Sequence, residues 1–264
     1  MDAFASLNEL FGLTGDIAVV TGAGAGIGRA IAQCLASVGA TIVAADCDLS
    51  SARATIDSLR SVSPRSIAVE TRVDEEASVE SLMQIVRDTF RGVDILVNNA
   101  GIYPFRPLRE MSAAEWDQVQ ATNLRGAFLC SRDAAVLMKQ SADGGRIVNV
   151  ASLVALHPAT SGLAHYGASK AGLISLTQSM AVEYANERIR VNAVVPGRIE
   201  TGQAMTQIGT PEQAAAAVSR LQRIPMQRLG QPHEVAAIAL FLAARASAYV
   251  TGQTVIVDGG LLLS

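Results

Sequence analysis

The stretch IAVVTGAGAGIG, residues 17–28, decides the fold of this chain. Its first part, Ile17–Thr21, is apolar at nearly every position, which is typical of a strand buried on both faces of a parallel sheet. A glycine-rich turn, Thr21–Gly28, follows directly. Ile27, Ile31 and Leu35 then recur with helical spacing. A strand, a glycine turn and a helix in this order predict the first unit of a doubly wound α/β domain.

The same alternation continues along the chain. Amphipathic stretches separate six further apolar runs, which predicts parallel strands joined by crossover helices. These runs are Thr41–Ala45, Ser66–Val69, Ile95–Val97, Arg146–Val150, Arg190–Val195 and Thr254–Val257. No composition break divides the chain. We therefore predict one Rossmann-type domain over residues 1–264, with a sheet of about seven strands and helices on both faces. Residues 202–231 are rich in glycine and proline, and we expect them to form a mobile lid.

Composition excludes several classes of protein. The net charge is -3 and 17% of residues are charged, so we expect no nucleic-acid partner. Apolar runs such as Ala236–Ala244 are shorter than the roughly 20 residues that span a bilayer, and Met1–Gly15 lacks a secretory signal pattern. Cys34, Cys47 and Cys130 have neither metal-ligand nor disulfide spacing. We expect a cytoplasmic protein without a bound metal or a membrane partner.

The glycine turn predicts a nucleotide site. Glycines let the backbone approach a pyrophosphate closely, and the following helix N-terminus supplies free N–H groups and a positive dipole end. An ordinary glycine-rich turn is the alternative, but the position between a strand and a helix favours a dinucleotide. We predict cofactor contacts from Gly22, Ala25, Gly26, Ile27 and Gly28.

The end of the second strand indicates which dinucleotide binds. Asp46 lies 18 residues after Gly28, and Asp48 adds a second negative charge. An acidic side chain here accepts hydrogen bonds from the adenosine ribose and repels a 2′-phosphate. The alternative is that Asp46 merely caps a loop. We predict NAD (NADH) rather than NADP, with Asp46 and Cys47 beside the adenosine.

Tyr166 and Lys170 are candidates for acid–base chemistry. Their spacing of four places them on one face of a helix, and a nearby ammonium favours the phenolate of a tyrosine, whose ordinary pKa is about 10. Ser152 follows the strand Arg146–Val150, where a hydroxyl would lie at the carboxyl end of the sheet. Taken singly, such a Tyr–Lys pair is usually a surface pair, and such a serine is usually a turn residue.

The combination of motifs, in this order, resembles the short-chain dehydrogenase/reductase family from about Leu13 to Gly260. The motifs are Thr21–Gly28, Asn98-Asn99-Ala100-Gly101, Asn123, Ser152, Tyr166 with Lys170, and Pro196-Gly197.

The resemblance implies a role for each catalytic residue. Tyr166 would be the general acid/base, and Lys170 would lower its pKa and bind the nicotinamide ribose. Ser152 would hydrogen-bond the substrate oxygen. Asn123 would kink its helix and hold a water that links Lys170 to solvent. Further cofactor contacts would come from Val73, Asn99, Ala100, Gly101, Pro196, Gly197, Ile199 and Thr201.

Two features depart from the family pattern. Arg72 stands where many members have an aspartate that binds the adenine amino group. The separation between Ser152 and Tyr166 is 14 residues, one more than is typical, and this reshapes the substrate loop Leu153–His165. We predict substrate contacts from Ser152 and Tyr166, and from His157 in that loop.

We therefore predict an NAD-dependent oxidoreductase that interconverts a secondary alcohol and its ketone. One alternative is a β-ketoacyl thioester (3-oxoacyl-ACP type) reductase, a role that more often uses NADP. A remote alternative is a non-catalytic nucleotide sensor, which would not need the complete Ser–Tyr–Lys–Asn set. The resemblance also implies a homotetramer or homodimer, which would pair the helices near Ala113–Met138 and Ala164–Tyr184 and bury Leu261–Leu263.

Overall fold

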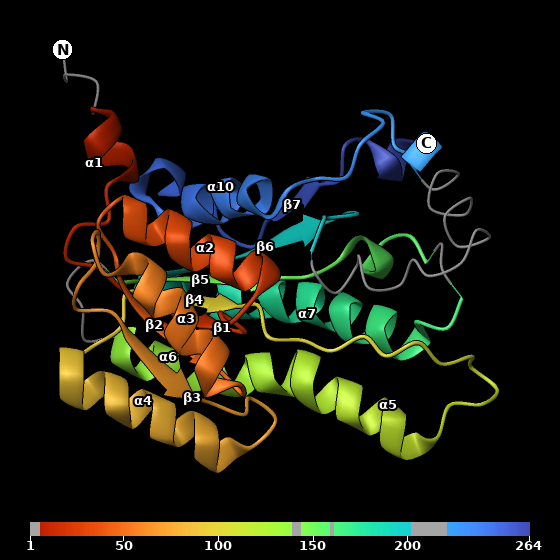
Figure 1. Ribbon diagram of the computed structural model, residues 1–264, viewed down its shortest axis with the longest axis horizontal. Coiled ribbons are helices and arrows are strands. Elements are labelled where there is room, and N and C mark those ends of the chain that lie inside the picture. The colour runs from red at the N-terminus through yellow and green to blue at the C-terminus, as the bar shows by residue number, and fades with distance from the viewer. Residues whose placement is uncertain (1–5, 139–143, 159–160, 202–220) are drawn as a thin grey trace.

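Seven parallel strands form one sheet in the order β3-β2-β1-β4-β5-β6-β7 (Figure 1). The computed structural model describes residues 6–138, 144–158, 161–201 and 221–264. The strands are β1 (Ile17–Thr21), β2 (Thr41–Asp46), β3 (Ile67–Glu70), β4 (Ile95–Asn98), β5 (Gly145–Val150), β6 (Ile189–Pro196) and β7 (Thr254–Val257). The strand order reverses between β1 and β4, which creates the crevice where doubly wound sheets bind ligands. The predicted fold class is confirmed.

The strand ends differ slightly from the sequence prediction. β2 continues to Asp46, which pairs with Glu70 of β3, and β4 continues to Asn98, which pairs with Asn149 of β5. The hydrogen-bond ladder therefore extends past the apolar run. Polar side chains consequently begin inside the sheet at its carboxyl edge, not in the loops beyond it.

Helices cover both faces of the sheet, as Figure 1 shows. One face carries α2 (Gly26–Ser37), α3 (Leu49–Leu59) and α10 (Pro232–Ala243), and the other carries α4 (Glu76–Phe90), α6 (Gly126–Met138) and α7 (Ala164–Glu183). Each layer encloses its own apolar core. Short helices complete the described chain: α1 (Leu7–Phe11), α5 (Ala113–Gln120), η2 (Leu153–Ala155), η3 (Ala185–Glu187), η4 (Arg245–Ser247) and η5 (Leu261–Leu263).

A π-helical turn, η1 (Ala121–Arg125), joins α5 to α6 in one continuous helical stretch. Asn123 lies at its centre and is 1% exposed. π-turns inside α-helices are rare and occur frequently at functional sites. The kink that the family resemblance implies at Asn123 is present.

Most of the expected lid, residues 202–220, lies outside the described residues. The described remainder packs against the body of the protein, since Ile224 joins Leu153, Val195 and Leu261 in a small apolar cluster. Gly230 also forms a bridge with Ile199. In the described parts of the chain, we find no helix with the length and apolar character needed to cross a membrane.

Candidate active site

The glycine turn is packed so closely that side chains are excluded from it. A Cβ atom at Gly28 would lie 2.1 Å from the Gly22 carbonyl oxygen and 2.4 Å from Asn99 Nδ2. Asn99 Nδ2 donates to the carbonyl oxygens of Thr21 and Gly22, both at 3.0 Å. Asn99 therefore buttresses the turn from the neighbouring strand β4, as the resemblance implies.

The N-terminus of α2 is available to an anion. Its N-cap residue is Ala25, and within the described part of the chain no side-chain capping hydrogen bond is made at this end of the helix. These groups and the positive end of the helix dipole suit a pyrophosphate. The closely packed glycines and the uncapped helix thus fit a dinucleotide, and Gly26 and Ile27 form the first turn that would receive it.

Two carboxylates lie where an adenosine would follow the pyrophosphate. Asp46 accepts hydrogen bonds from the backbone N–H groups of Gly24 at 2.8 Å and Asp48 at 3.0 Å. Asp48 caps α3, and its hydrogen bonds with Ser50 and Ser51 lower its pKa to about 2. The site therefore carries two negative charges, with the exposed Cys47 between them.

Arg72 does not offset these charges. Its guanidinium forms ion pairs with Asp74 at 3.0 Å and Glu75 at 2.5 Å. The next residue, Val73, is 7% exposed and lies against Gly126 at the start of α6. The side chain that replaces the family's adenine-binding aspartate is thus paired with its own loop, whereas Val73 belongs mainly to the core.

Lys170 and Tyr166 lie side by side on α7. Lys170 is 3% exposed, and its Nζ donates to the Val150 carbonyl oxygen at the end of β5, at 2.7 Å. The same Nζ lies 5.9 Å from the centroid of the Tyr166 ring. Desolvation by burial lowers the pKa of Lys170 to about 8, because burial disfavours the charged form.

Ser152 lies within hydrogen-bond reach of the Tyr166 hydroxyl. Burial raises the pKa of Tyr166, the hydrogen bond with Ser152 lowers it in part, and Tyr103 raises it further. The net effect in the chain alone is a raised pKa of Tyr166, and the expected lowering of this pKa by the Lys170 ammonium stays a prediction. Desolvation of the phenolate outweighs the favourable contacts.

Asn123 connects the π-turn to both neighbouring segments. Its Oδ1 accepts from the Ile102 N–H at 2.8 Å, and its Nδ2 donates to the Ile102 carbonyl at 2.8 Å and to Ser169 Oγ at 3.1 Å. Gly101 lies against both Asn123 and Lys170. A Cβ atom at this position would lie 3.2 Å from Asn123 Oδ1 and 3.5 Å from Lys170 Nζ. The structure thus brings all four predicted catalytic residues to the carboxyl edge of the sheet.

A second anchor of α7, which the sequence reasoning missed, lies below Lys170. Asn149 of β5 donates to Thr177 Oγ1 at 2.8 Å, and Asn98 of β4 donates to Asn149 Oδ1 at 2.8 Å. All three residues are buried. Thr177 follows Lys170 by two helical turns. Asn149 and Val150 are adjacent in β5, and their hydrogen bonds with Thr177 and Lys170 hold one face of α7 against the strand. The sequence did carry a signal for this anchor, since Asn98 and Asn149 are polar residues within otherwise apolar strands.

The segment after β6 lies across from the glycine turn. Gly197 donates its N–H to the Val257 carbonyl at 2.9 Å, and Ile199 is 9% exposed. Thr201 Cγ2 lies 3.4 Å from the Cβ position of Gly26. The predicted contacts Pro196–Thr201 and the glycine turn therefore face the same crevice.

The two histidines near Tyr166 differ in setting. His165 is fully buried, and its Nδ1 accepts from the Tyr166 N–H at 2.9 Å. Its ring therefore holds the first turn of α7. His157 is half-buried just after η2, and its contact with a substrate stays a prediction.

The chain belongs to the short-chain dehydrogenase/reductase family, and it is an oxidoreductase of that family. A family model described as enoyl-(acyl carrier protein) reductase matches residues 22–262. The 3-oxoacyl-[acyl-carrier-protein] reductase FabG of Vibrio cholerae is 40% identical over 251 residues, which cover 95% of this chain and 99% of that protein.

The comparison with solved structures leads to the same family. A putative short-chain alcohol dehydrogenase from Sinorhizobium meliloti has a TM-score of 0.90 at 36% identity, covering 97% of this chain and 99% of that one. A putative NAD(P)-dependent gluconate 5-dehydrogenase from Beutenbergia cavernae, with bound NADP at low occupancy, has a TM-score of 0.88 at 36% identity, covering 96% and 99%. The family uses a nicotinamide cofactor, and the cofactor bound in this neighbour is NADP.

Proposed function

We propose that this protein interconverts a secondary alcohol and its ketone by hydride transfer with NAD(H), with Tyr166 as the general acid/base. The observation that carries the proposal is the convergence of two hydroxyl groups, Tyr166 and Ser152, beside the buried Lys170 at the carboxyl edge of the sheet.

When bound, the nicotinamide cofactor supplies the acceptor or donor of the hydride. The residues that would hold it are Gly22, Ala25–Gly28, Asp46, Cys47, Val73, Asn99–Gly101, Tyr166, Lys170, Pro196, Gly197, Ile199 and Thr201.

In the oxidative direction, Tyr166 takes the proton of the substrate hydroxyl as the carbinol C–H bond gives up its electron pair and hydrogen as hydride. Ser152 donates a hydrogen bond to the substrate oxygen and stabilises its developing charge. The Lys170 ammonium favours the phenolate of Tyr166 electrostatically. Asn123 would hold the water that passes the released proton to solvent. In reduction the same residues act in reverse, and Tyr166 protonates the new alkoxide.

The preference for NAD is supported by charge at the adenosine end. Asp46 and Asp48 are both negative. Of two nearby cations, Arg72 is paired with Asp74 and Glu75, and the Arg29 guanidinium donates to the Gly24 carbonyl and Thr55 Oγ1. A 2′-phosphate would meet like charge there, and like charges close together are strongly unfavourable. A ribose hydroxyl would instead find an acceptor in Asp46.

A 3-oxoacyl-[acyl-carrier-protein] reductase is the second candidate. The names of several relatives, at 38–40% identity, favour it more than they favour a general alcohol dehydrogenase. Its chemistry at Tyr166 and Ser152 is the same, since a 3-oxoacyl thioester is also a ketone. The two candidates differ in the substrate pocket and in the expected cofactor.

The test is an assay of purified protein with secondary alcohols and either NAD or NADP, and with an acetoacetyl thioester and either reduced cofactor, followed by nicotinamide absorbance. The proposal predicts alcohol oxidation with kcat/KM at least tenfold higher for NAD than for NADP. In Asp46→Ala this preference should shrink. Selective use of the thioester with NADPH would support the second candidate and contradict the proposal.

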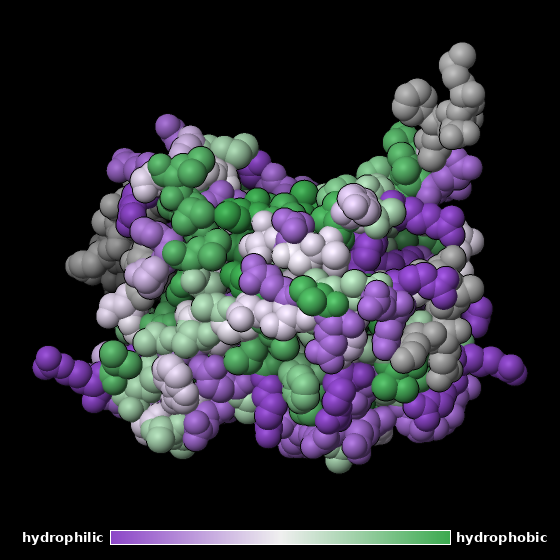
Figure 2. All heavy atoms as spheres, turned by 180° about the vertical axis from the view of Figure 1, so that it is seen from behind, coloured by the Kyte–Doolittle hydropathy of each residue, from purple (hydrophilic) through white to green (hydrophobic). Residues whose placement is uncertain are grey.

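We also propose a homotetramer that uses two faces. Leu124, Phe128 and Leu176 line an open apolar groove between α5, α6 and α7. The outer edge of β7 forms the other face. Figure 2 views the molecule from that side and shows hydrophobic residues over a large part of it, where Ile256 is 39% exposed. Leu261 packs within its own chain, so Leu263, which is 91% exposed, is the C-terminal leucine that remains available for a subunit contact.

Light scattering of wild type and Phe128→Glu tests the assembly. The variant should fall to dimers, and a wild-type monomer would contradict the proposed tetramer. A cytoplasmic location also stays a prediction.

A further inference from the structure

The loop after β4 and the loop after β5 contact each other near Tyr166. The Arg106 N–H donates to the Gly162 carbonyl at 2.9 Å. The Phe105 ring packs over Gly162, whose φ of +83° and missing side chain permit the approach, since a Cβ atom there would lie 2.6 Å from the ring. In Figure 1 both loops run along the right-hand side, beyond the carboxyl ends of the strands. These two contacts hold the loop after β4 against Gly162, four residues before Tyr166.

Tyr103 begins the first of these loops and contacts the reacting tyrosine. Its ring centroid lies 5.6 Å from that of Tyr166, with an angle of 55° between the planes. The Tyr103 hydroxyl is hydrogen-bonded to Thr201, and the side chain is 37% exposed. Because Thr201 engages the polar end, the ring presents mainly apolar surface to the space beside the Tyr166 hydroxyl.

Among the residues that the structure describes, the two loops expose apolar side chains near this ring, and the cation between them is paired. Phe105 and Leu156, one on each loop, are 62% and 43% exposed. Arg106, the cation next to Phe105, is paired with Glu115 at 2.8 Å. Exposed apolar side chains on two neighbouring loops are typical of a surface that binds an uncharged, apolar ligand.

We infer that Tyr103 is a specificity-determining residue: its ring forms an aromatic wall that selects alcohols and ketones with a flat, uncharged apolar group on the reacting carbon. This inference rests on the proposed function. An aromatic substituent would pack on the wall in the tilted or offset geometry that aromatic pairs prefer, which adds to the gain from the buried area. Together with that area, the contact predicts a preference of about tenfold over a small aliphatic group.

The experiment compares kcat/KM for 1-phenylethanol and 2-butanol in wild type, Tyr103→Ala and Tyr103→Phe. Wild type should prefer 1-phenylethanol. Tyr103→Ala should lower the ratio of the two values about tenfold, whereas Tyr103→Phe, which keeps the ring, should retain it. Tyr249, 105% exposed, offers a matched control, and Tyr249→Ala should leave the ratio unchanged. The Kd of NADH, measured by fluorescence, should stay the same in every variant.

An unchanged ratio in Tyr103→Ala, or a wild-type preference for 2-butanol, would overturn the inference. Tyr166→Phe separates this outcome from failure of the proposed function. If Tyr166→Phe abolishes turnover but the ratio does not depend on Tyr103, the hydride chemistry stands and the aromatic wall fails. If wild type reduces an acetoacetyl thioester through Tyr166 and oxidises neither alcohol, the substrate class is likewise overturned.

Discussion

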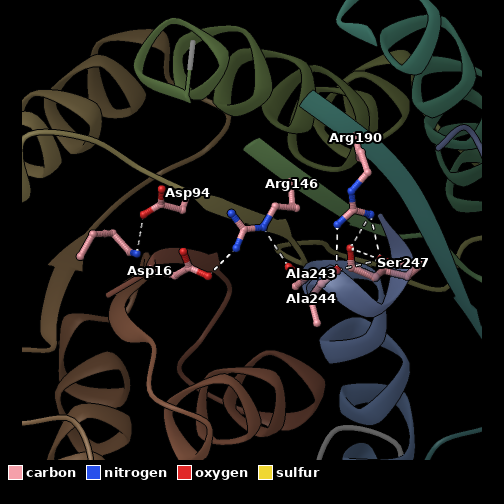
Figure 3. Close-up of polar contacts among 9 residues, drawn as sticks. Asp16, Asp94, Arg146, Arg190, Ala243, Ala244 and Ser247 are labelled. Atoms are coloured by element: carbon pink, nitrogen blue, oxygen red, sulfur yellow. Dashed lines mark hydrogen bonds and ion pairs between the residues drawn. The ribbon is translucent and has the colours of Figure 1, made fainter. Parts of the chain in front are cut away.

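Lys170 at the carboxyl edge of the sheet and Arg190 at its amino edge are both substantially buried cations, but their partners differ. Within the described residues, Lys170 donates one hydrogen bond, to Val150. Arg190 donates to four acceptors, at 2.8–3.3 Å: the carbonyls of Leu242, Ala244 and Val250, and Ser247 Oγ. Figure 3 shows Arg190 directed at Ala244 and Ser247. The guanidinium at the amino edge is thus held by several acceptors, whereas the ammonium at the carboxyl edge has one acceptor and lies beside Tyr166.

Arg146 extends the amino-edge cluster. It is the register partner of Arg190, and its Nε donates to the Ala243 carbonyl at 2.9 Å while its guanidinium pairs with Asp16. Figure 3 shows both arginines directed at the C-terminal end of α10. They bind its last carbonyls, which form the negative end of the helix dipole. Burial, followed by repulsion from Arg146, lowers the pKa of Arg190 to about 10, so it remains charged at neutral pH.

Replacing Lys170 should damage activity far more than stability. Lys170→Met removes the ammonium that supports proton transfer, and such contributions are typically about 10²–10⁴-fold in rate. We expect kcat to fall by roughly that factor with little change in Tm, measured by turnover assays and thermal unfolding. If Lys170→Met lowered Tm strongly and kept its specific activity, Lys170 would serve stability and not catalysis, which would contradict the role proposed for the carboxyl edge.

Arg190→Met is the opposite test. It leaves several buried carbonyls without donors, and each such loss destabilises by about 1–3 kcal/mol. We expect a loss of about 3 kcal/mol in the free energy of unfolding, measured by urea titration. The kcat of the remaining folded enzyme should stay within about twofold of wild type, since no catalytic residue contacts Arg190. A large fall in kcat with unchanged stability would show that the amino edge serves catalysis.

Thr177→Val tests whether the second anchor of α7 positions Tyr166. The change keeps the shape but leaves Asn149 Nδ2 without its acceptor, at a cost of about 1–3 kcal/mol. Because the same helix carries Tyr166, we expect kcat to fall about three- to tenfold with KM nearly unchanged. Thr177→Ser, which keeps the hydroxyl, should behave as wild type. A loss of stability with unaltered kcat would mean that the anchor is only structural.

The smallest effect is expected from His165 at acid pH. Burial lowers its pKa from the ordinary value of 6.5, although Glu115 opposes this, and its Nδ1 must stay unprotonated to accept from Tyr166. The unfolded chain therefore binds a proton at a higher pH than the folded chain does. The stability from neutral His165 is present above about pH 6.5 and lost as pH falls toward the lowered folded value.

Thermal unfolding at several pH values checks this against His165→Asn, whose amide oxygen can still accept from Tyr166. Wild type should lose more Tm than the variant between pH 7.5 and pH 5.5, by about a few degrees. Equal losses in the two proteins would show that His165 is not protected from protonation.

Much of the fold could be predicted because each strand is a separate apolar run with its own turn signals. Ile17–Thr21 and Thr254–Val257 were predicted with the boundaries that the structure has. The catalytic set was predictable too, since the motif order identifies it. The sequence could not predict which residues distant along the chain become neighbours in the sheet. The Arg146–Arg190 pair depends on the register of β5 against β6, which only the assembled sheet defines.

Electrostatics at the site was less predictable than its residues. The spacing of Tyr166 and Lys170 predicts a lowered tyrosine pKa, but burial raises it. The degree of burial depends on segments distant in the sequence, such as the loop that carries Tyr103. The contact between Tyr103 and Tyr166 brings together residues 63 positions apart, and no local pattern marks it.

The central claim, that Tyr166 transfers the proton at a nicotinamide site, is tested most directly by Tyr166→Phe in a paired assay of NADH binding and turnover. The phenyl ring fills the same space but carries no hydroxyl. The account predicts a Kd for NADH within about twofold of wild type and a loss of kcat of about a thousandfold, in the range of general acid–base catalysis. Turnover within tenfold of wild type would contradict it.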